Sequence, residues 1–456
     1  MSALSFAQPL KFTPLPRERL LVHHVPSGAW VMIREGDRAR VATLANAINL
    51  GRLDRICDLD DPILAPFAKA GLLRERGSRP VHETKNAGPV RMLILKLVGY
   101  CNLACTYCYD FNSESYTARL SVEDAELAIE QALSLSEDGL QLLFHGGEPL
   151  LAFKAVTRLT AFARTRAAAL GRKVSFSIQT NGTRFTDEVV SLLLDEDVRI
   201  GLSIDGPPEL NDMYRIDHRR RGSSKRIEEA LAAHPELLPK IGALTTVTAS
   251  NVDRLADIID YVRSLGIRSW DATLFQEAGR GSQADNAMAP TVDRVVSAWL
   301  AMLDRVDRGD YDDIRVSPVL HYVHNVLTYA RNNICMRGGG CGAARELISI
   351  AADGSIEACD CLKIPKLTLG RIDGGGLAAA RASEAADAIR SRTQNSLRPC
   401  ASCDVRAYCG GTCLAKAGAL DAIDDTECAL ALALFPEIFR RLARSDGLEL
   451  YARLHP

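Results

Sequence analysis

The chain has 456 residues, which is enough for about two to four domains of ordinary size. Hydrophobic residues make up 47% of the sequence and charged residues 25%, proportions that exclude a disordered chain, a collagen and a disulfide-dense miniprotein. The formal net charge of −2 provides no general basic field, so neither nucleic acid nor a membrane surface is expected as a partner. Residues 1–11 lack the pattern of a secretory signal, and no apolar run is long enough to cross a membrane, so we expect a cytoplasmic protein.

Residues 1–75 are predicted to form a small unit of their own. The turn-forming sequence Pro26-Ser27-Gly28 between two short β-type runs predicts a hairpin, and Gly71 is a stop signal for the helical stretch before it. The elements expected here are strands over Leu20–Val25 and Trp30–Arg34 and helices over Arg38–Leu50 and Asp61–Ala70. Turn formers and low apolar content in residues 76–89 then predict a linker.

Between residues 90 and 310, β-type and helical segments alternate. Strands are expected over Met92–Val98, Leu140–Phe144, Val174–Ile178, Val198–Ser203, Ala243–Val247 and Ser269–Leu274, with helices such as Ser121–Leu135 and Val156–Leu170 between them. This alternation is typical of an α/β fold with a parallel sheet. Because these units are too few for a closed eight-stranded barrel, we predict an open, partial (β/α)6 barrel of the TIM type. In such barrels the chemistry lies on the loops that follow the strands.

The β/α alternation ends near residue 311. Cysteine, glycine and short segments occupy the rest of the sequence, up to a helix expected over Phe435–Leu454. We therefore predict a separate cysteine-rich domain over residues 311–456.

The chain contains 13 cysteines, most of them clustered. In a cytoplasmic protein, clustered cysteines are more often metal ligands than disulfide partners. Cys101, Cys105 and Cys108 follow the first predicted barrel strand. Three thiolates on one tight loop can hold three irons of a [4Fe–4S] cluster and leave the fourth iron open to a non-protein ligand. A structural zinc site would instead require four protein ligands.

The sequence Cys-Asn-Leu-Ala-Cys-Thr-Tyr-Cys-Tyr over residues 101–109 resembles the signature of radical S-adenosylmethionine (SAM) enzymes. The resemblance implies that the open iron chelates the amino and carboxylate groups of SAM. It also implies that one electron splits SAM into methionine and a 5′-deoxyadenosyl radical, which abstracts a hydrogen atom from the substrate. The protein would position and shield the reacting groups, while the cofactor carries the chemistry.

Further motifs fit the same resemblance, each after a later predicted strand: Gly146-Gly147-Glu148-Pro149, Gln179-Thr180-Asn181-Gly182 and Ser203-Ile204-Asp205-Gly206-Pro207. The resemblance assigns Glu148 to the ammonium group of SAM and the later motifs to its ribose and carboxylate. Arg215 is a candidate for the carboxylate, because a guanidinium binds a carboxylate in fork geometry. The SAM-binding residues that the resemblance implies are Tyr107, Gly146, Gly147, Glu148, Gln179, Ser203, Asp205 and Arg215.

The cysteines of the C-terminal part resemble those of the SPASM domain, an extension of many peptide-modifying radical SAM enzymes. They are Cys335, Cys341, Cys359, Cys400, Cys403, Cys409, Cys413 and Cys428. Their thiolates suffice for two fully ligated [4Fe–4S] clusters, which would bring the total to three. By resemblance to the sulfatase-maturating branch, one cluster takes Cys335, Cys341, Cys359 and Cys413, and the other takes Cys400, Cys403, Cys409 and Cys428. The alternative is one or two structural zinc sites, since Cys-x2-Cys pairs also bind zinc.

Asp360 directly follows Cys359, at a place where sulfatase-maturating relatives have a proposed catalytic base. A carboxylate beside a cluster in a sheltered cavity can have a shifted pKa, which would suit that role. The alternative is a solvated turn or a hydrogen-bonded cap. Two cysteines fall outside the ligand sets: Cys57 is expected to pack, and Cys361 either packs or is a spare thiol near a cluster.

The leading functional hypothesis is a peptide maturase that oxidises a side chain of a ribosomally made precursor and forms a C–C or thioether crosslink. The layout of residues 1–75 resembles a winged-helix precursor-recognition element, which binds a leader peptide as an added strand. A capping or dimerising domain is the alternative for this unit. The expected partners are the precursor peptide and an electron donor such as flavodoxin or ferredoxin. The basic run from Arg215 to Arg226 either faces an acidic leader or is a solvated face.

Two other functions stay open. The first is an anaerobic sulfatase-type maturase, which converts Cys or Ser to formylglycine. The SPASM cysteines and Asp360 favour it, whereas the extra residues before the barrel count against it. The second is a non-enzymatic iron–sulfur redox module, which would need no SAM pocket.

Overall fold

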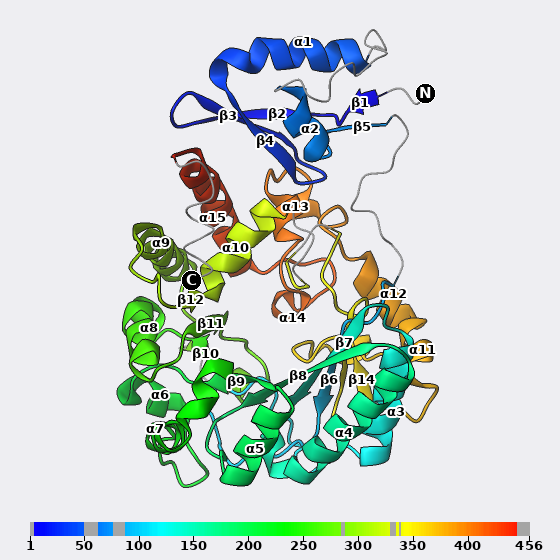
Figure 1. The fold of residues 1–456 in the computed structure, drawn as a ribbon, viewed down its shortest axis with the longest axis vertical. Coiled ribbons are helices and arrows are strands. Elements are labelled where there is room, and N and C mark those ends of the chain that lie inside the picture. Colours follow the sequence, from blue (N-terminus) through cyan, green and yellow to red (C-terminus); the bar gives the residue numbers. More distant parts are fainter. Residues whose placement is uncertain are drawn as a thin grey trace.

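The structure, a computed structural model, describes residues 4–49, 63–75, 87–283, 288–328, 334–336 and 339–444. It is an α/β fold with a central, mostly parallel sheet and a cysteine-rich C-terminal region, as predicted. Figure 1 shows the N-terminal unit at the top, helices from the C-terminal part below it, and the curved sheet with its helices at the bottom. Within these ranges, every helix is too short or too polar to cross a membrane.

Among the described residues, the central sheet has ten strands. In spatial order they are β12 (Arg315–Val316), β11 (Ser269–Leu274), β10 (Ile241–Val247), β9 (Arg199–Ser203), β8 (Lys173–Thr180), β7 (Gly139–His145), β6 (Met92–Lys96), β13 (Leu347–Ile350), β14 (Ser355–Glu357) and β15 (Gly370–Arg371). The pairs from β12 to β13 are parallel, and β14 and β15 join in antiparallel fashion. Every strand predicted between residues 90 and 310 is present, and together they form the open barrel.

Helices cover the outer face of this sheet (Figure 1). They are α3 (Val122–Ser134), α4 (Phe153–Ala169), α5 (Asp187–Asp195), α6 (Pro208–Tyr214), α7 (Ser224–Ala233), α8 (Leu255–Ser264) and α9 (Val292–Arg308). Ser121 caps the start of α3, because its side chain accepts a hydrogen bond from Asp124 N–H. The buried residues of α3 recur at helical spacing, so one apolar face packs on the sheet.

The sheet does not stop at the predicted division between residues 310 and 311. Strand β13 pairs in parallel with β6, which puts the C-terminal region directly beside the first barrel strand. The four residues Leu-Ile-Ser-Ile of β13 are all buried, and so short an apolar run carries little sequence signal. The helix α10 (Ser317–Leu327) separates β12 from this strand.

The last helix, α15 (Asp425–Arg444), begins well before the predicted start at Phe435. Pro436 lies inside it, although proline normally favours the first turn of a helix. Residues 445–454 of the predicted helix lie outside the described residues.

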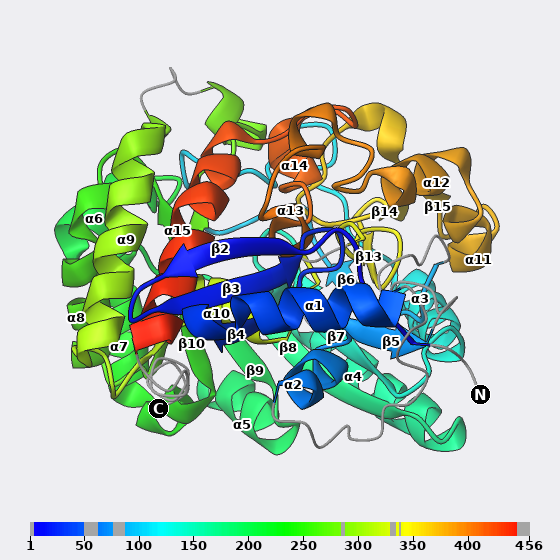
Figure 2. The same ribbon diagram turned by 90° about the horizontal axis from the view of Figure 1, so that it is seen from above.

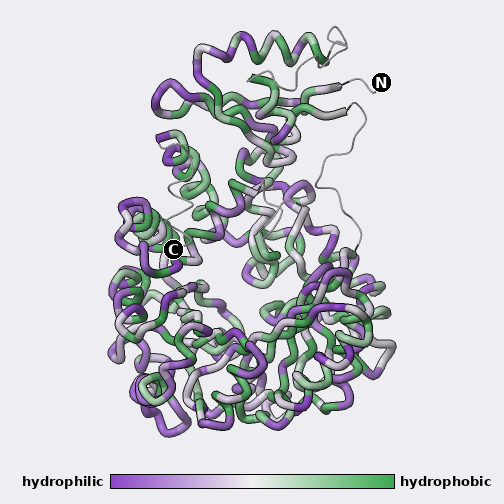
Figure 3. The backbone as a smooth tube through the Cα atoms, in the orientation of Figure 1, coloured by the Kyte–Doolittle hydropathy of each residue, from purple (hydrophilic) through white to green (hydrophobic). Residues whose placement is uncertain are grey.

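The N-terminal unit has a hydrophobic cluster of its own, which includes Phe6, Val22 and Phe67. Its elements are β1 (Leu4–Phe6), β2 (Lys11–Leu15), β3 (Arg19–His24), β4 (Ala29–Arg34), α1 (Arg38–Asn49), α2 (Leu64–Lys69) and β5 (Leu73–Glu75). The predicted hairpin is β3–β4, joined by β2 in a three-stranded antiparallel sheet. Figure 3 shows hydrophilic and hydrophobic residues alternating along α1, whose apolar side packs on this cluster.

The three-stranded sheet of the N-terminal unit is seated on the C-terminal helices, and Figure 2 shows it lying over α15. Trp30 Nε1 donates to the carbonyl oxygen of Val326 at 2.8 Å, and its ring meets Phe439 edge-on at 5.3 Å between centroids. Gly28 faces the short helix α13 (Arg406–Cys409), where an added Cβ would lie 3.1 Å from Cβ of Ala407. The unit therefore packs closely on the cysteine-rich region.

Replacing Trp30 by alanine removes both the ring contact and the indole donor. We expect the free energy of unfolding to fall by about 2–3 kcal/mol. This is less than for a fully buried tryptophan, because Trp30 is only partly buried. The measurement is the thermal unfolding midpoint of the holoprotein. Trp30→Phe is the matched control, since it keeps a ring against Phe439 and loses only the hydrogen bond, worth about 1 kcal/mol. Equal losses for the two variants would contradict the importance of the ring contact.

Candidate active site

The carboxyl-terminal ends of the parallel strands surround a cavity of about 350 Å³. Residues at and after the ends of β6, β7, β8 and β9 line it, together with Asp360 and Cys361 from the C-terminal region. This is the edge of the sheet at which barrels of this type carry their chemistry. The fold thus brings the loop that carries Cys101, Cys105 and Cys108, called the cysteine loop below, and the predicted base Asp360 to one cavity.

Cys101, Cys105 and Cys108 all line this cavity. The backbone N–H of Leu103 donates to Cys101 Sγ at 3.3 Å, and the side-chain amide of Asn181 lies 3.6 Å from the same sulfur. Burial raises the pKa of Cys101 to about 12 and that of Cys108 to about 11, so metal binding must displace their protons. Three thiols at one cavity fit the protein ligands of a [4Fe–4S] cluster with one open iron.

The turn after β7 requires glycine at two positions. Gly146 and Gly147 have φ of +81° and +48°, in the left-handed region that glycine tolerates best. A Cβ on Gly147 would lie 2.0 Å from the carbonyl oxygen of Tyr100, and one on Gly146 would lie 2.6 Å from Cβ of Lys96. The turn therefore packs directly on the backbone that leads into Cys101.

Glu148 is fully buried behind this turn and joins the ends of two strands. Its carboxylate accepts hydrogen bonds from Thr180 Oγ1 at 2.8 Å, Asn181 N–H at 2.8 Å and Leu150 N–H at 3.1 Å. Burial raises the pKa of Glu148, and these donors oppose the rise. Neither Glu148 nor Gly146 belongs to the cavity wall, so their predicted contact with SAM stays a prediction.

The other residues assigned to SAM form two hydrogen-bonded groups. Gln179 Nε2 donates to Ser203 Oγ at 2.8 Å, and both side chains line the cavity. The Tyr107 hydroxyl donates to Asp205 at 2.5 Å and accepts from Arg215 Nη1 at 2.8 Å. Tyr107 and Arg215 are on the cavity wall, whereas Asp205 lies behind it. The buried Nε of Arg215 has no hydrogen-bond partner among the described residues, so this guanidinium fits the carboxylate of a ligand.

Four of the predicted cluster ligands surround a second, small cavity of about 20 Å³. They are Cys400, Cys403, Cys409 and Cys428. Burial raises the pKa of Cys409 to about 12, so metal binding must displace the proton of this thiol too. The geometry fits a fully ligated [4Fe–4S] cluster, and a zinc ion takes the same four ligands.

The other predicted ligands gather beside the main cavity, with one addition. Cys335 lies within electrostatic range of Cys341, Cys413 and Cys361. The ligand atoms of Cys359, Asp360 and Cys361 all lie within 4.8 Å of one another. The structure thus brings Cys361 to this set as a fifth thiol, whereas Cys57 lies outside the described residues.

Asp360 connects this thiol group to the main cavity, which it lines. Its carboxylate accepts a hydrogen bond at 2.8 Å from the hydroxyl of Tyr109, the residue after Cys108. Burial alone would raise the pKa of Asp360, but His145, Lys96 and the Tyr109 hydroxyl outweigh it and hold the pKa below its ordinary value. An ionised carboxylate at this place can accept a proton.

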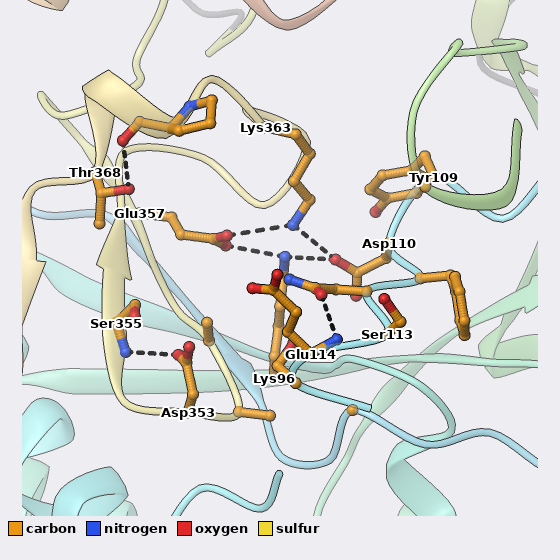
Figure 4. A pocket seen from close by; sticks show the side chains of 18 of the residues that line it. Lys96, Tyr109, Asp110, Ser113, Glu114, Asp353, Ser355, Glu357, Lys363 and Thr368 are labelled. Carbon is orange, nitrogen blue, oxygen red and sulfur yellow. Dashed lines mark hydrogen bonds and ion pairs between the residues drawn. The ribbon is translucent and has the colours of Figure 1, made fainter. Parts of the chain in front are cut away.

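A closed ring of ion pairs lies at the end of β6, in a neighbouring cavity of about 480 Å³ (Figure 4). Lys96 Nζ lies 2.7 Å from Asp110 and 2.9 Å from Glu357, and Lys363 Nζ lies 2.8 Å from Asp110 and 3.2 Å from Glu357. Lys96 also donates to the backbone carbonyl of Asp360 at 2.9 Å. Burial alone would lower the pKa of Lys96, but Asp110 and Glu357 hold it well above its ordinary value. The ring ties the cysteine loop to the strand that leads to Asp360.

Sequence reasoning missed several residues of this site. Lys96 ends an otherwise apolar strand, and a charged residue at a buried position was an available signal for a partner. His145 directly precedes the glycine turn, lines the cavity and accepts a hydrogen bond from Gly146 N–H at 2.7 Å. Tyr109 lay inside the recognised signature, but its contact with Asp360 spans 251 positions in the sequence and only the fold reveals it.

The fifth thiol can be tested by replacing each member of the Cys359/Cys361 pair with serine. We expect Cys359→Ser to lower the iron content of the reconstituted protein by about four atoms per chain, since a [4Fe–4S] cluster held here would lose a ligand. Cys361→Ser should keep all the iron. The readout is iron and sulfide analysis with the Mössbauer spectrum. The reverse result would make Cys361 the ligand in place of Cys359.

The ion-pair ring predicts unequal losses of stability for its two lysines. Lys96→Met leaves two buried carboxylates with a single cation, which costs about 3–5 kcal/mol. Lys363→Met should cost clearly less, because the Lys363 side chain is 29% exposed and water can replace it, against 4% for Lys96. Denaturant unfolding of the two variants measures the difference. Equal losses would show that the ring does not act through buried charge.

Comparison with known proteins agrees with this geometry. Residues 95–262 match the family model of the radical SAM superfamily. The serine-type anaerobic sulfatase-maturating enzyme of Klebsiella aerogenes is 28% identical over 355 residues, which span 76% of this chain and 85% of that protein. The cysteine-type enzyme of Clostridium perfringens strain 13 is 24% identical over 305 residues, spanning 62% of this chain and 78% of that protein.

Two solved structures share the fold. The anSMEcpe structure with bound AdoMet has a TM-score of 0.69 and 20% identity, covering 80% of this chain and 98% of that one. Streptococcus suis SuiB bound to S-adenosylmethionine has a TM-score of 0.56 and 15% identity, covering 93% of this chain and 99% of that one. The cysteine loop, the cavity and these matches together identify a radical SAM domain in this chain, which is similar in sequence to the anaerobic sulfatase-maturating enzymes and has a SPASM-like, cysteine-rich C-terminal region.

Proposed function

We propose that this enzyme oxidises one side chain of a peptide or unfolded protein segment, by chemistry of the formylglycine-forming type. The observation that carries the proposal is the position of Asp360. Its ionised carboxylate lines the cavity that the three cysteines line, and Tyr109 of the cysteine loop holds it there. SAM bound at the cluster would supply a 5′-deoxyadenosyl radical, which takes a hydrogen atom from the substrate carbon.

The residues of this chain account for the rest of the oxidation. After the hydrogen atom is taken, loss of a proton and an electron turns an alcohol carbon into the aldehyde. The same loss turns a thiol carbon into a thioaldehyde, which water hydrolyses to the aldehyde with release of hydrogen sulfide. Asp360 would accept the proton, because it is ionised and faces the cavity. The electron needs an acceptor nearby, and the thiols around Cys335 and Cys359 adjoin Asp360. We propose that they hold an auxiliary [4Fe–4S] cluster and that Cys400, Cys403, Cys409 and Cys428 hold another, three clusters in all.

The sequence relatives favour this reading over crosslink formation. Matches to sulfatase-maturating enzymes run through both the barrel and the C-terminal region, since they span 76% of this chain. The curated names of these relatives state action on sulfatases, with serine-type and cysteine-type members. A serine or cysteine side chain is therefore the proposed target.

Crosslink formation in a ribosomally made precursor is the second candidate, and the N-terminal unit favours it. The fold shared with SuiB covers 93% of this chain and so reaches into residues 1–75, whereas that shared with anSMEcpe covers 80%. SuiB has also been solved with its precursor peptide SuiA. In this chain β2 and β4 are the outer strands of the three-stranded sheet, and an outer strand is where a leader peptide would add.

The two candidates differ in the group that they produce. Synthetic peptides carrying a single serine or cysteine are incubated with SAM and dithionite, and the products are treated with a hydrazide reagent before mass spectrometry. Formylglycine contains an aldehyde and forms a hydrazone, whereas a crosslink loses two hydrogens and does not react. We expect the hydrazone. A hydrazide-resistant product would establish the crosslink instead, and no modified peptide with either target would overturn both.

If Asp360 is the base, the variant Asp360→Asn should still abstract hydrogen but should form much less product. A missing general base lowers product formation at least about 100-fold. Cleavage of SAM to 5′-deoxyadenosine should continue, since it does not need the carboxylate. Chromatography of 5′-deoxyadenosine and mass spectrometry of the peptide measure the ratio.

Tyr109→Phe is the matched control for this prediction, because it keeps the base and removes only its hydrogen-bond donor. Its product yield should fall by about tenfold or less. The iron content of both variants must equal that of the wild type. A normal product-to-5′-deoxyadenosine ratio in Asp360→Asn would rule out the proposed base.

A further inference from the structure

A group of arginines lies on the surface behind the cysteine loop. Arg219, Arg220 and Arg221 are exposed and follow α6 on a tight turn. They do not line the main cavity, and the proposed reaction does not involve them. Because the whole chain carries a net charge of only −2, so dense a basic group is a local feature and not part of a general field.

The turn is held firmly by one buried carboxylate. Asp217 accepts hydrogen bonds from the backbone N–H of Arg219 at 2.8 Å and of Arg221 at 3.0 Å, and it pairs with the Arg221 guanidinium at 2.8 Å. Arg220 adopts a φ of +61°, a conformation that glycine or asparagine would adopt more readily. The carboxylate of Asp217 thus binds groups inside the turn, whereas the side chains of Arg219 and Arg220 are exposed to solvent.

The same turn is bonded to the backbone of the cysteine loop. Asp217 forms a β-bridge with Leu103, and Ala104 N–H donates to the Ile216 carbonyl at 2.7 Å. The exposed His218 contacts the carbonyl oxygen of Cys101 through Nε2 at 2.9 Å. A single hydrogen bond therefore separates a surface side chain from the backbone of a cluster ligand.

We propose that this turn is the docking surface for an acidic one-electron carrier protein that reduces the cluster at Cys101, Cys105 and Cys108. The inference rests on the proposed function, which needs one electron for each SAM cleaved. The reduced carrier gives up that electron and becomes oxidised by one equivalent, the oxidised cluster accepts it, and no bond or proton is transferred. Met213, near the end of the preceding helix, is an exposed apolar residue, with 50% of its surface accessible.

The position of the turn favours an electron carrier over an acidic precursor peptide. Figure 1 shows α6 and α7, which flank the turn, at the lower left, far from the N-terminal unit at the top. The turn contacts the backbone of the cysteine loop, whereas Asp360 reaches the cavity from the C-terminal region. Charge complementarity at such a surface accelerates association and makes it dependent on salt.

The test compares two reductants on the reconstituted holoenzyme. Flavodoxin hydroquinone is the probe for the docking surface, and dithionite is the small reductant that needs no docking. The variant is Arg219→Glu with Arg220→Glu, which leaves the Arg221–Asp217 pair intact. We expect the rate of cluster reduction by flavodoxin at low ionic strength, followed by stopped-flow absorbance, to fall at least about tenfold. The direct affinity for flavodoxin, measured by titration calorimetry, should fall in parallel.

Two control proteins keep the test decisive. Lys173→Glu makes the same kind of charge reversal at an exposed residue. Lys173 begins β8 and so lies at the amino-terminal ends of the parallel strands, away from the cysteine loop. This variant should leave the rate of cluster reduction by flavodoxin unchanged. Arg219→Lys with Arg220→Lys keeps the charge and should restore the rate. High salt should slow the wild type toward the rate of the glutamate variant.

The outcomes separate this inference from the proposed function. Unchanged reduction and affinity in the glutamate variant would overturn the docking surface, even if peptide oxidation with dithionite is normal. A raised KM for the peptide with dithionite, and normal reduction by flavodoxin, would assign the turn to an acidic substrate instead. Failure of wild-type enzyme to oxidise any peptide with dithionite would count against the proposed function alone, since cluster reduction by flavodoxin is measured without a peptide.

Discussion

The buried ring of Lys96, Asp110, Lys363 and Glu357 holds the two halves of the active site together. Removing four charges from water is costly, and buried ion pairs seldom add net stability over an apolar core of similar volume. Here each cation contacts both anions, so no buried charge is left without a partner. What the ring provides is position: it fixes the cysteine loop, through Asp110, against the strand and loop that carry Glu357 and Lys363. Lys96 of the ring also donates to the carbonyl oxygen of Asp360, so the ring contributes to the position of Asp360 relative to the cysteine loop.

The parallel pairing of β13 with β6 brings the members of the ring within reach of one another. Leu347 pairs with Met92 and Ile350 with Leu95, so both strands run toward the same edge of the sheet. The chain then turns back through β14, which ends at Glu357 beside Lys96. Asp360 follows three residues later, with its carbonyl on Lys96 and its carboxylate on Tyr109. A carboxylate held by backbone and side chain together needs little reorganisation when a ligand binds.

The residues of this site that can be predicted from the sequence are those that belong to contiguous motifs. The cysteine loop and the glycine turn each follow a strand whose apolar run is easy to detect, and Gln179 lies at the end of another, so their meeting at one edge follows from parallel topology alone. The rest depends on contacts between distant segments. Strand β13 is only four residues long. The ion-pair ring joins residues more than 240 positions apart, and the contact of Trp30 with Phe439 joins the N-terminal unit to the last helix. Periodicity and propensity contain no information on such pairings, which only the packed fold decides.

The same dependence on distant contacts applies to the region that the N-terminal unit covers. Helix α13 is a single turn, Arg406–Cys409, and a helix that short has too few hydrogen bonds to be stable alone. It is held at Cys409 by the four-thiol group and on its other side by Gly28 and the ring of Phe439 against Tyr408. Because burial raises the pKa of Cys409 to about 12, a metal bound here would have to displace its proton, and the free energy of metal binding would add to the folding of this turn. A metal site at these four cysteines would therefore also stabilise the surface on which the N-terminal sheet sits, and it would link metal content to the packing of that unit through one turn of helix.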